Sequence, residues 1–173
     1  IVGDVRDSMA VDASLAGCDC CFHLASLISP EQAGGNWRRM EQVVLGGTLN
    51  VLDAASRAGG PLLVLASSAA VYGHRTGNIQ TEADLTRPLS IYGASKLAGE
   101  KFASAFAQSH RLPITALRLF NVYGPQIATP SKSVVNRFVN AIRYGRSVQI
   151  FGNGAQIRDF VHVDDVVQAF LAA

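Results

Sequence analysis

Short apolar runs alternate along this chain with longer stretches of helical spacing, and this alternation constrains the fold more than any other feature. The apolar runs are Cys20–Ala25, Leu62–Ala66 and Ile114–Phe120. None shows the strict apolar-polar alternation of a strand with one wet face, so we expect strands that are buried on both faces. Helices that connect parallel strands cover both faces of such a sheet. The sequence therefore predicts an α/β fold, with a parallel sheet and helices on both faces.

The stretches between the runs have the spacing and end signals of helices. Apolar residues recur at helical intervals over Trp37–Ala58, and Gly59-Gly60-Pro61 follows as a stop signal. Two further helices are expected over about Ser90–Ser109 and Val134–Tyr144, and a short late strand over Val148–Phe151. We find no repeats, no low-complexity tracts and no second domain.

Composition and charge exclude several classes of protein. A chain of 173 residues with 49% hydrophobic and 16% charged residues can form one globular core. A net charge of +2, with scattered basic residues, predicts no binding to nucleic acid or to membranes. No apolar stretch is long enough to span a bilayer and no signal peptide opens the chain, so we expect a cytoplasmic protein. No cluster of metal-ligand spacing is present, and core packing is the expected role of Cys18, Cys20 and Cys21.

Tyr92 and Lys96 lie one helical turn apart and share a helix face. A free phenol has a pKa of ~10, and a neighbouring cation lowers that pKa by favouring the phenolate. The pair could therefore transfer protons near neutral pH. The alternative is that Tyr92 packs in the core and Lys96 is solvated.

Residues that follow the expected strands are further candidates, because ligands of parallel sheets bind beyond the carboxyl ends of the strands. Ser67 and Ser68 follow the second run, and His23-Leu-Ala-Ser26 closes the first with small side chains that a cofactor could approach. The alternative role for each serine is to satisfy the backbone of its own loop.

Taken in order, six segments resemble the extended short-chain dehydrogenase/reductase family, and within it the NAD-dependent epimerase/dehydratase group acting on nucleotide sugars. The fold that this implies is Rossmann-like. The resemblance covers nearly the whole chain, and its order and spacing make it specific. The segments are Gly3–Asp7, His23–Ser26, Ser67–Gly73, Tyr92–Lys96, Arg118–Pro125 and Gly152–Asp165.

The resemblance implies a role for each matching residue. Tyr92 would be the general base and acid, Lys96 would lower its pKa and hold the nicotinamide ribose, and Ser68 would bind the reacting sugar oxygen. Residues implied at the cofactor, which would be NAD with NADP not excluded, are Asp4, Val5, Leu24, Ala25, Ser26, Ser67, Tyr92, Lys96 and Phe120. Residues implied at the nucleotide-diphosphate sugar are Ser68, Asn121 and Arg158, with an Arg158–Asp159 ion pair as the alternative for Arg158. Asp164 is expected to cap a following helix.

Two departures from the family pattern qualify these expectations. Val44 stands where the family has Asn, which removes a polar contact near the active site. No glycine-rich strand-to-helix turn is present to bind the pyrophosphate. We therefore expect residues 1–173 to be an inactive interior piece of a longer enzyme: a partial dinucleotide-binding domain that lacks its first strands, with the start of the substrate-binding region from about residue 121.

The residues after Ser68 separate the activities of the family. Dehydratases need an Asp-Glu acid/base pair at this point, and Ala69-Ala70 can neither donate nor accept a proton. The first expectation is a UDP-glucose 4-epimerase-like enzyme that is homodimeric at full length. The alternatives are a reductase, decarboxylase or dehydratase of nucleotide sugars, or a non-catalytic dinucleotide-binding member.

Overall fold

The computed structural model describes residues 2–29, 31–74, 79–125 and 134–173 of the chain. These residues form two compact units, of which the first extends to Arg118 and also takes in Ala173, and the second covers Leu119–Ala172. Each unit is described by itself.

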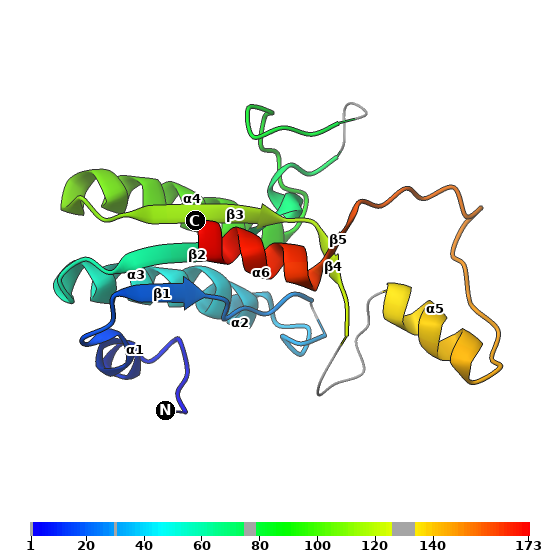
Figure 1. Cartoon of the computed structure of the whole chain (residues 1–173), viewed down its shortest axis with the longest axis horizontal. Helices are drawn as coiled ribbons and strands as arrows, with labels where there is room; N and C mark the ends of the chain where they lie inside the picture. The colour runs from blue at the N-terminus through cyan, green and yellow to red at the C-terminus, as the bar shows by residue number, and fades with distance from the viewer. Residues whose placement is uncertain (1, 30, 75–78, 126–133) are drawn as a thin grey trace. The chain divides into compact units, whose positions relative to one another are not determined.

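The first unit is built on a three-stranded sheet with the order β1-β2-β3. Strand β1 is Cys20–His23, β2 is Leu62–Ser68 and β3 is Ile114–Leu119. β1 and β2 pair in parallel, with Cys20 opposite Leu62 and His23 opposite Leu65. Figure 1 shows β1 and β3 running in the same direction on either side of β2. The predicted α/β class with a parallel sheet is confirmed.

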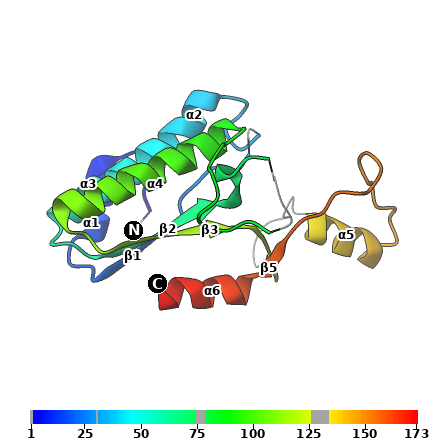
Figure 2. The same ribbon diagram turned by 90° about the horizontal axis from the view of Figure 1, so that it is seen from above.

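Helices α1 (Ser8–Leu15), α3 (Gly47–Arg57) and α4 (Ile91–His110) lie together on one face of this sheet (Figure 2). Helix α4 begins where the sequence indicated, because the Ser90 side chain caps it by accepting a hydrogen bond from the Gly93 amide at 3.0 Å.

The predicted helix over Trp37–Ala58 is present but not uniform. Helix α2 (Trp37–Glu41) passes through one wide π-helical turn, η1 (Gln42–Gly46), before α3 begins. Turns of this kind inside α-helices are frequently found at functional sites. Val44, the residue that departs from the family pattern, lies in this turn and is 1% exposed.

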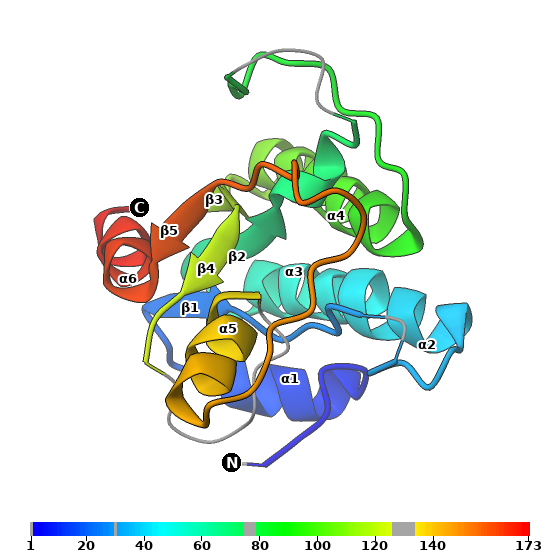
Figure 3. The ribbon, with the colours of Figure 1, turned by 90° about the vertical axis from the view of Figure 1, so that its right-hand side faces the viewer.

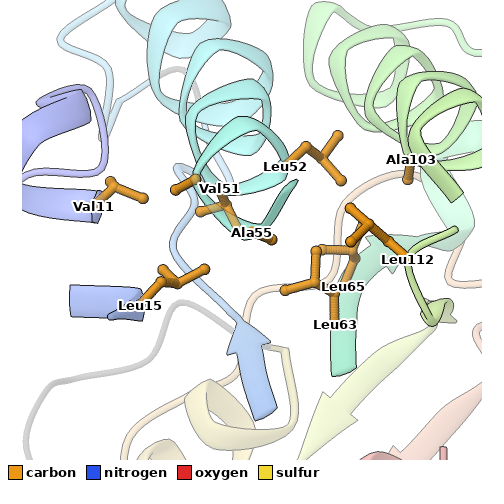
Figure 4. Close-up of a cluster of buried hydrophobic side chains, with 10 residues drawn as sticks. Val11, Leu15, Val51, Leu52, Ala55, Leu63, Leu65, Ala103 and Leu112 are labelled. Atoms are coloured by element: carbon orange, nitrogen blue, oxygen red, sulfur yellow. The ribbon is translucent and has the colours of Figure 1, made fainter. Parts of the chain in front are cut away.

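The core of the first unit lies between the sheet and these helices. Leu52 of α3 and Leu63 of β2 are fully buried at its centre. Figure 4 shows Leu52 and Ala55 of α3 close to Leu63 and Leu65, and α1 contributing from the other side of α3. The buried members of the cluster are Val11, Leu15, Val51, Leu52, Ala54, Ala55, Leu63, Leu65, Ala103 and Leu112.

Several predicted boundaries are wrong. β1 ends at His23 rather than Ala25, β2 continues two residues past Ala66, and β3 stops one residue before Phe120. Val148–Phe151 forms no strand, because no other strand pairs with it in the described part of the chain, and Ile150 and Phe151 instead line a cavity. Helix α1 was not predicted, since its eight residues hold only a weak amphipathic pattern. It is capped by Asp7, which accepts from the Met9 and Ala10 amides.

The second unit contains a short parallel pair of strands, β4 (Asn121–Tyr123) and β5 (Phe160–His162), seen side by side in Figure 3. Helix α5 is Val134–Arg143, close to its predicted span, and helix α6 is Val163–Ala172. Asp164 lies in the first turn of α6 rather than at its N-cap, so the predicted cap is wrong. Its carboxylate still lies at the positive end of the helix dipole.

The structure also bears on the three cysteines and on the search for a membrane-spanning helix. Cys18 and Cys20 are exposed and Cys21 is half-buried, so core packing is wrong for the first two, because both lie at or before the start of β1. Among the helices of the described ranges, none combines the length and apolar character needed to cross a membrane.

Candidate active site

Helix α4 turns one polar stripe toward the end of β2. Lys96 on that stripe is only 6% exposed, and its ammonium donates a hydrogen bond to the Ala66 carbonyl at 2.7 Å. The alternative of a solvated Lys96 is therefore wrong. The Lys96 nitrogen lies 5.9 Å from the centre of the Tyr92 ring, so the predicted pair does share one site.

Tyr92 is half-buried and packs against a small apolar cluster of Ala33, Met40 and Val44. Burial raises the pKa of its phenol, and the nearby Ser68 and Ser26 hydroxyls oppose that rise. The expected lowering by Lys96 is thus wrong for this structure: the ammonium is directed to the Ala66 carbonyl, and burial dominates.

Burial also acts on Lys96, whose pKa falls to about 8 because a charged amine is costly to enclose. An amine in this range exchanges its proton near neutral pH. The site therefore holds two titrating groups, a phenol and an amine, whose pKa values burial shifts in opposite directions and so moves further apart.

The two serines at the end of β2 have different partners. The Ser68 oxygen accepts a hydrogen bond from the Ala70 amide at 3.2 Å and caps the short 3-10 turn η2 (Ala69–Val71). Ser68 therefore has the alternative role, because it bonds to the backbone of its own loop. It also lies beside the Tyr92 phenol. Ser67 is 5% exposed and its hydroxyl donates to the Glu100 carboxylate of α4.

The end of β1 supplies the remaining small residues near the phenol. Leu24 is 60% exposed, and Ala25 is exposed as well. The Ser26 hydroxyl is buried and makes no hydrogen bond of ordinary geometry within the described ranges. An orphaned buried hydroxyl costs free energy unless a ligand or water satisfies it. Such a group beside Tyr92 and Lys96 fits the polar ribose and amide groups of a bound nicotinamide nucleotide.

Asp4 and Val5, implied at the adenine, lie in the segment before α1. Asp4 forms an exposed ion pair with Arg6 at 2.6 Å, and hydrogen bonds from Arg6 lower its pKa to about 2. The Val5 carbonyl accepts from the Asn50 amide group at 2.9 Å, and the Val5 side chain packs against the core. Their contact with a cofactor stays a prediction.

Phe120, Asn121 and Arg158 belong to the second unit. Phe120 is half-buried, and the Asn121 side chain donates to the Asp159 carbonyl at 2.8 Å, which ties β4 to the segment before β5. Arg158 is exposed and donates only to the Ile157 carbonyl among its described hydrogen bonds. In the described residues, no ion pair joins Arg158 to Asp159.

Arg158 lines a cavity of about 700 Å³ within the second unit. Most of its other walls are apolar or aromatic, and Gln149 and Gln156 add side-chain amides. A flat base and an anionic group could be accommodated together in such a cavity. The lining residues are Val134, Val135, Phe138, Gln149, Ile150, Phe151, Gly154, Gln156, Ile157, Arg158 and Phe160.

A smaller cavity of about 270 Å³ lies beside Tyr92 in the first unit. Its walls come from the loop after β1, from α2 and from the start of α4. They are mostly apolar, with Ile28, Trp37 and Met40 among them. Tyr92 therefore has space on one side, while Lys96 and Ser68 lie on its other sides.

Sequence reasoning missed the charged and imidazole groups that surround the predicted site. Glu100 and Arg118 form an ion pair at 2.8 Å that is largely buried. His23, 5% exposed, lies 3.0 Å from the Thr48 hydroxyl. One signal was available in the sequence: Glu100 is four residues after Lys96 and eight after Tyr92, so it continues the same helix stripe.

Comparison with known proteins identifies a family for this chain. Residues 1–173 match the NAD dependent epimerase/dehydratase family. The chain is 36% identical over 171 residues to UDP-glucose 4-epimerase of Mycolicibacterium smegmatis, covering 94% of this chain and 55% of that protein. It is 34% identical over 170 residues to dTDP-glucose 4,6-dehydratase of Streptomyces griseus, covering 98% and 51%.

A solved structure gives the same picture in three dimensions. The UDP-glucuronic acid 4-epimerase of Bacillus cereus, in complex with UDP-glucuronic acid and NAD, superimposes with a TM-score of 0.86 at 28% identity. The superposition covers 98% of this chain and 53% of that one. The chain spans about half the length of the curated relatives that it matches over nearly all of its own length. It belongs to the NAD-dependent epimerase/dehydratase family.

Proposed function

We propose that the full-length protein is a NAD-dependent 4-epimerase of UDP-sugars, with Tyr92 as its acid and base. The observation that carries the proposal is the convergence of Tyr92 and Lys96 from α4 with Ser68 from the end of β2. Bound NAD would accept a hydride from the sugar carbon and return it to the opposite face.

The protein's own groups handle the proton and the oxygen. Tyr92 removes the proton from the sugar hydroxyl, and Ser68 holds the oxygen as it becomes a carbonyl. Lys96 lies with its amine 5.9 Å from the centre of the phenol ring and would hold the nicotinamide ribose. The buried Ser26 hydroxyl, which lies beside the Tyr92 phenol, would bind the nicotinamide ribose or the sugar.

Epimerisation is favoured over elimination of water by the residues that follow Ser68. Ala69 and Ala70 form the turn η2 and carry no proton donor or acceptor. A dehydratase of the kind that matches this chain needs such a group to eliminate water. The relative from Streptomyces griseus therefore supports the family but not the reaction.

Arg158 and its cavity would hold the uridine diphosphate. The guanidinium can donate two parallel hydrogen bonds to a diphosphate, and the aromatic and apolar walls can enclose the base. Arg158→Ala should weaken UDP-sugar binding by about 1.5 to 3 kcal/mol, or ~10- to 150-fold, and leave NAD affinity unchanged. The control is Arg143→Ala on α5, since Arg143 stacks over Tyr144 and does not line this cavity.

The reaction itself is tested by product analysis. The full-length protein is incubated with NAD and, separately, UDP-glucose, UDP-glucuronate and UDP-N-acetylglucosamine, and the sugars are analysed by NMR. The expected product is the C4 epimer of at least one of them, with no net NADH. Loss of water from the sugar, a stoichiometric yield of NADH, or binding without turnover would each contradict the proposal.

A further inference from the structure

The polar stripe of α4 makes three contacts with the end of β2, and each is one helical turn from the next. Tyr92 lies beside Ser68, Lys96 donates to the Ala66 carbonyl, and Glu100 accepts from the Ser67 hydroxyl. The three contacts together reach three consecutive residues of β2. The position of the helix along the strand is therefore set by side chains on both elements.

Glu100 is the one charged member of the stripe with an ionic partner. Its Oε2 accepts a hydrogen bond from the Arg118 guanidinium of β3 at 2.8 Å, and its Oε1 accepts another from the same group at 3.0 Å. The Ser67 hydroxyl also donates to Oε1. The two side chains are 11% and 20% exposed. A carboxylate this enclosed, with three neighbouring donors, has little freedom to reorient.

Arg118 carries the network to the other side of Ser68. Its guanidinium donates to the Tyr72 hydroxyl at 2.9 Å and lies 4.9 Å from the centre of the Tyr72 ring. Tyr72 is 4% exposed and directly follows the turn that Ser68 caps. Ser68 is thus flanked by two residues, Ser67 before it and Tyr72 after it, that are both bonded to one buried ion pair.

We propose that Glu100 is a positioning residue of the active site: through Ser67 on one side and Arg118 with Tyr72 on the other, it holds the Ser68 hydroxyl against the Tyr92 phenol. This inference rests on the proposed roles of Ser68 and Tyr92. Glu100 itself touches neither substrate nor cofactor in this account, and its effect passes through the backbone of residues 67 to 72.

A positioning role for Glu100 and a purely electrostatic role predict opposite shifts in the pKa of Tyr92. Removing a nearby negative charge favours the phenolate and would lower the pKa of Tyr92. Displacing Ser68 removes a hydroxyl that favours the phenolate, and would raise that pKa. A change that affects only folding would reduce the amount of native protein and leave the pKa of its Tyr92 unchanged.

The measurement is an NMR titration of the full-length protein labelled with ¹³C at the tyrosine ring carbon that bears the hydroxyl. Tyr92→Phe identifies the Tyr92 signal. In Glu100→Gln and in Ser67→Ala, the onset of phenolate formation should move up by ~0.5 pH unit or more. Ser67→Ala is the decisive variant, because it is uncharged and leaves the Glu100–Arg118 pair in place. It answers the question even where Glu100→Gln fails to fold.

The matched control is Asp53→Asn, which breaks an exposed ion pair with Arg57 on α3 and should leave the Tyr92 titration unchanged. In the enzyme assay, Ser67→Ala should lower kcat ~5-fold or more and shift the pH profile in the same direction as the titration. A Tyr92 titration equal to wild type in folded Ser67→Ala, or a downward shift in Glu100→Gln, would overturn the positioning role. The titration needs no substrate. A protein with no epimerase activity would therefore contradict the proposed function, and the titration would still test whether Glu100 positions Ser68.

Discussion

The imidazole of His23 lies 3.0 Å from the hydroxyl oxygen of Thr48, and both residues are buried. The Thr48 hydroxyl donates its own proton to the Val44 carbonyl at 2.7 Å. Its oxygen can therefore only accept from the imidazole, so His23 donates through Nε2. Burial, together with the charge of Lys96, lowers the pKa of His23 to about 4.

This contact predicts a loss of stability in acid. Because the folded-state pKa is lower than the usual 6.5, the stabilisation is complete above pH 6.5 and is lost as the pH falls toward 4. The loss should be about 3 kcal/mol. Urea denaturation of wild type and His23→Gln between pH 7.5 and 4 measures it, and the two curves should converge in acid. His110→Gln, at the exposed end of α4, is the control; parallel curves for His23→Gln and wild type would contradict the assignment.

Gly93 allows α4 to approach the turn η2, which carries the backbone after Ser68. A Cβ at this position would lie 2.6 Å from the Ala70 carbonyl oxygen. Gly93→Ala should therefore destabilise the protein by about 1 to 3 kcal/mol. Gly46→Ala is the matched control, since Gly46 is also helical and nothing lies within 4 Å of its added Cβ. That variant should be stabilised by ~0.5 to 1 kcal/mol. Thermal melts of both decide the point, and equal effects would show that no close approach exists.

Lys96 should titrate well below an ordinary lysine. Burial lowers its pKa to about 8, so the charged form destabilises the fold below pH 8 and that cost is relieved as the pH rises toward 10.5. The ¹³C signal of its terminal methylene, identified with Lys96→Met, should move with a midpoint near 8. A midpoint near 10.5 would show that the amine is not desolvated.

The sequence predicts the local geometry of the helices better than it predicts burial and contacts between distant residues. Tyr92 and Lys96 share one face because their spacing is a property of any helix, and Ser90 marks the start of α4 through its own cap. The Ser67–Glu100 contact joins residues 33 positions apart, and no local pattern specifies it. The rise in the Tyr92 pKa was missed for a related reason, since burial depends on the packing of segments distant in the chain.

Local sequence patterns also failed to predict the π-helical turn η1 and the absence of a strand at Val148–Phe151. Val44 continues the apolar spacing of its helix, and nothing in that spacing separates an α-helical turn from a wider one. Val148–Phe151 has the composition of a strand, yet a strand also needs a partner with unpaired backbone groups. In the described residues the β4-β5 pair forms elsewhere in the second unit.

The central claim is that Tyr92 transfers the proton during epimerisation of a UDP-sugar. Tyr92→Phe in the full-length protein removes the titrating oxygen and keeps the ring in its apolar cluster. Turnover measured by NMR of the sugar product should fall by at least ~10²-fold, with UDP-sugar affinity within threefold of wild type. Tyr144→Phe, which removes an exposed hydroxyl of the second unit, should leave turnover unchanged. A Tyr92→Phe enzyme with turnover within threefold of wild type would remove Tyr92 from the mechanism.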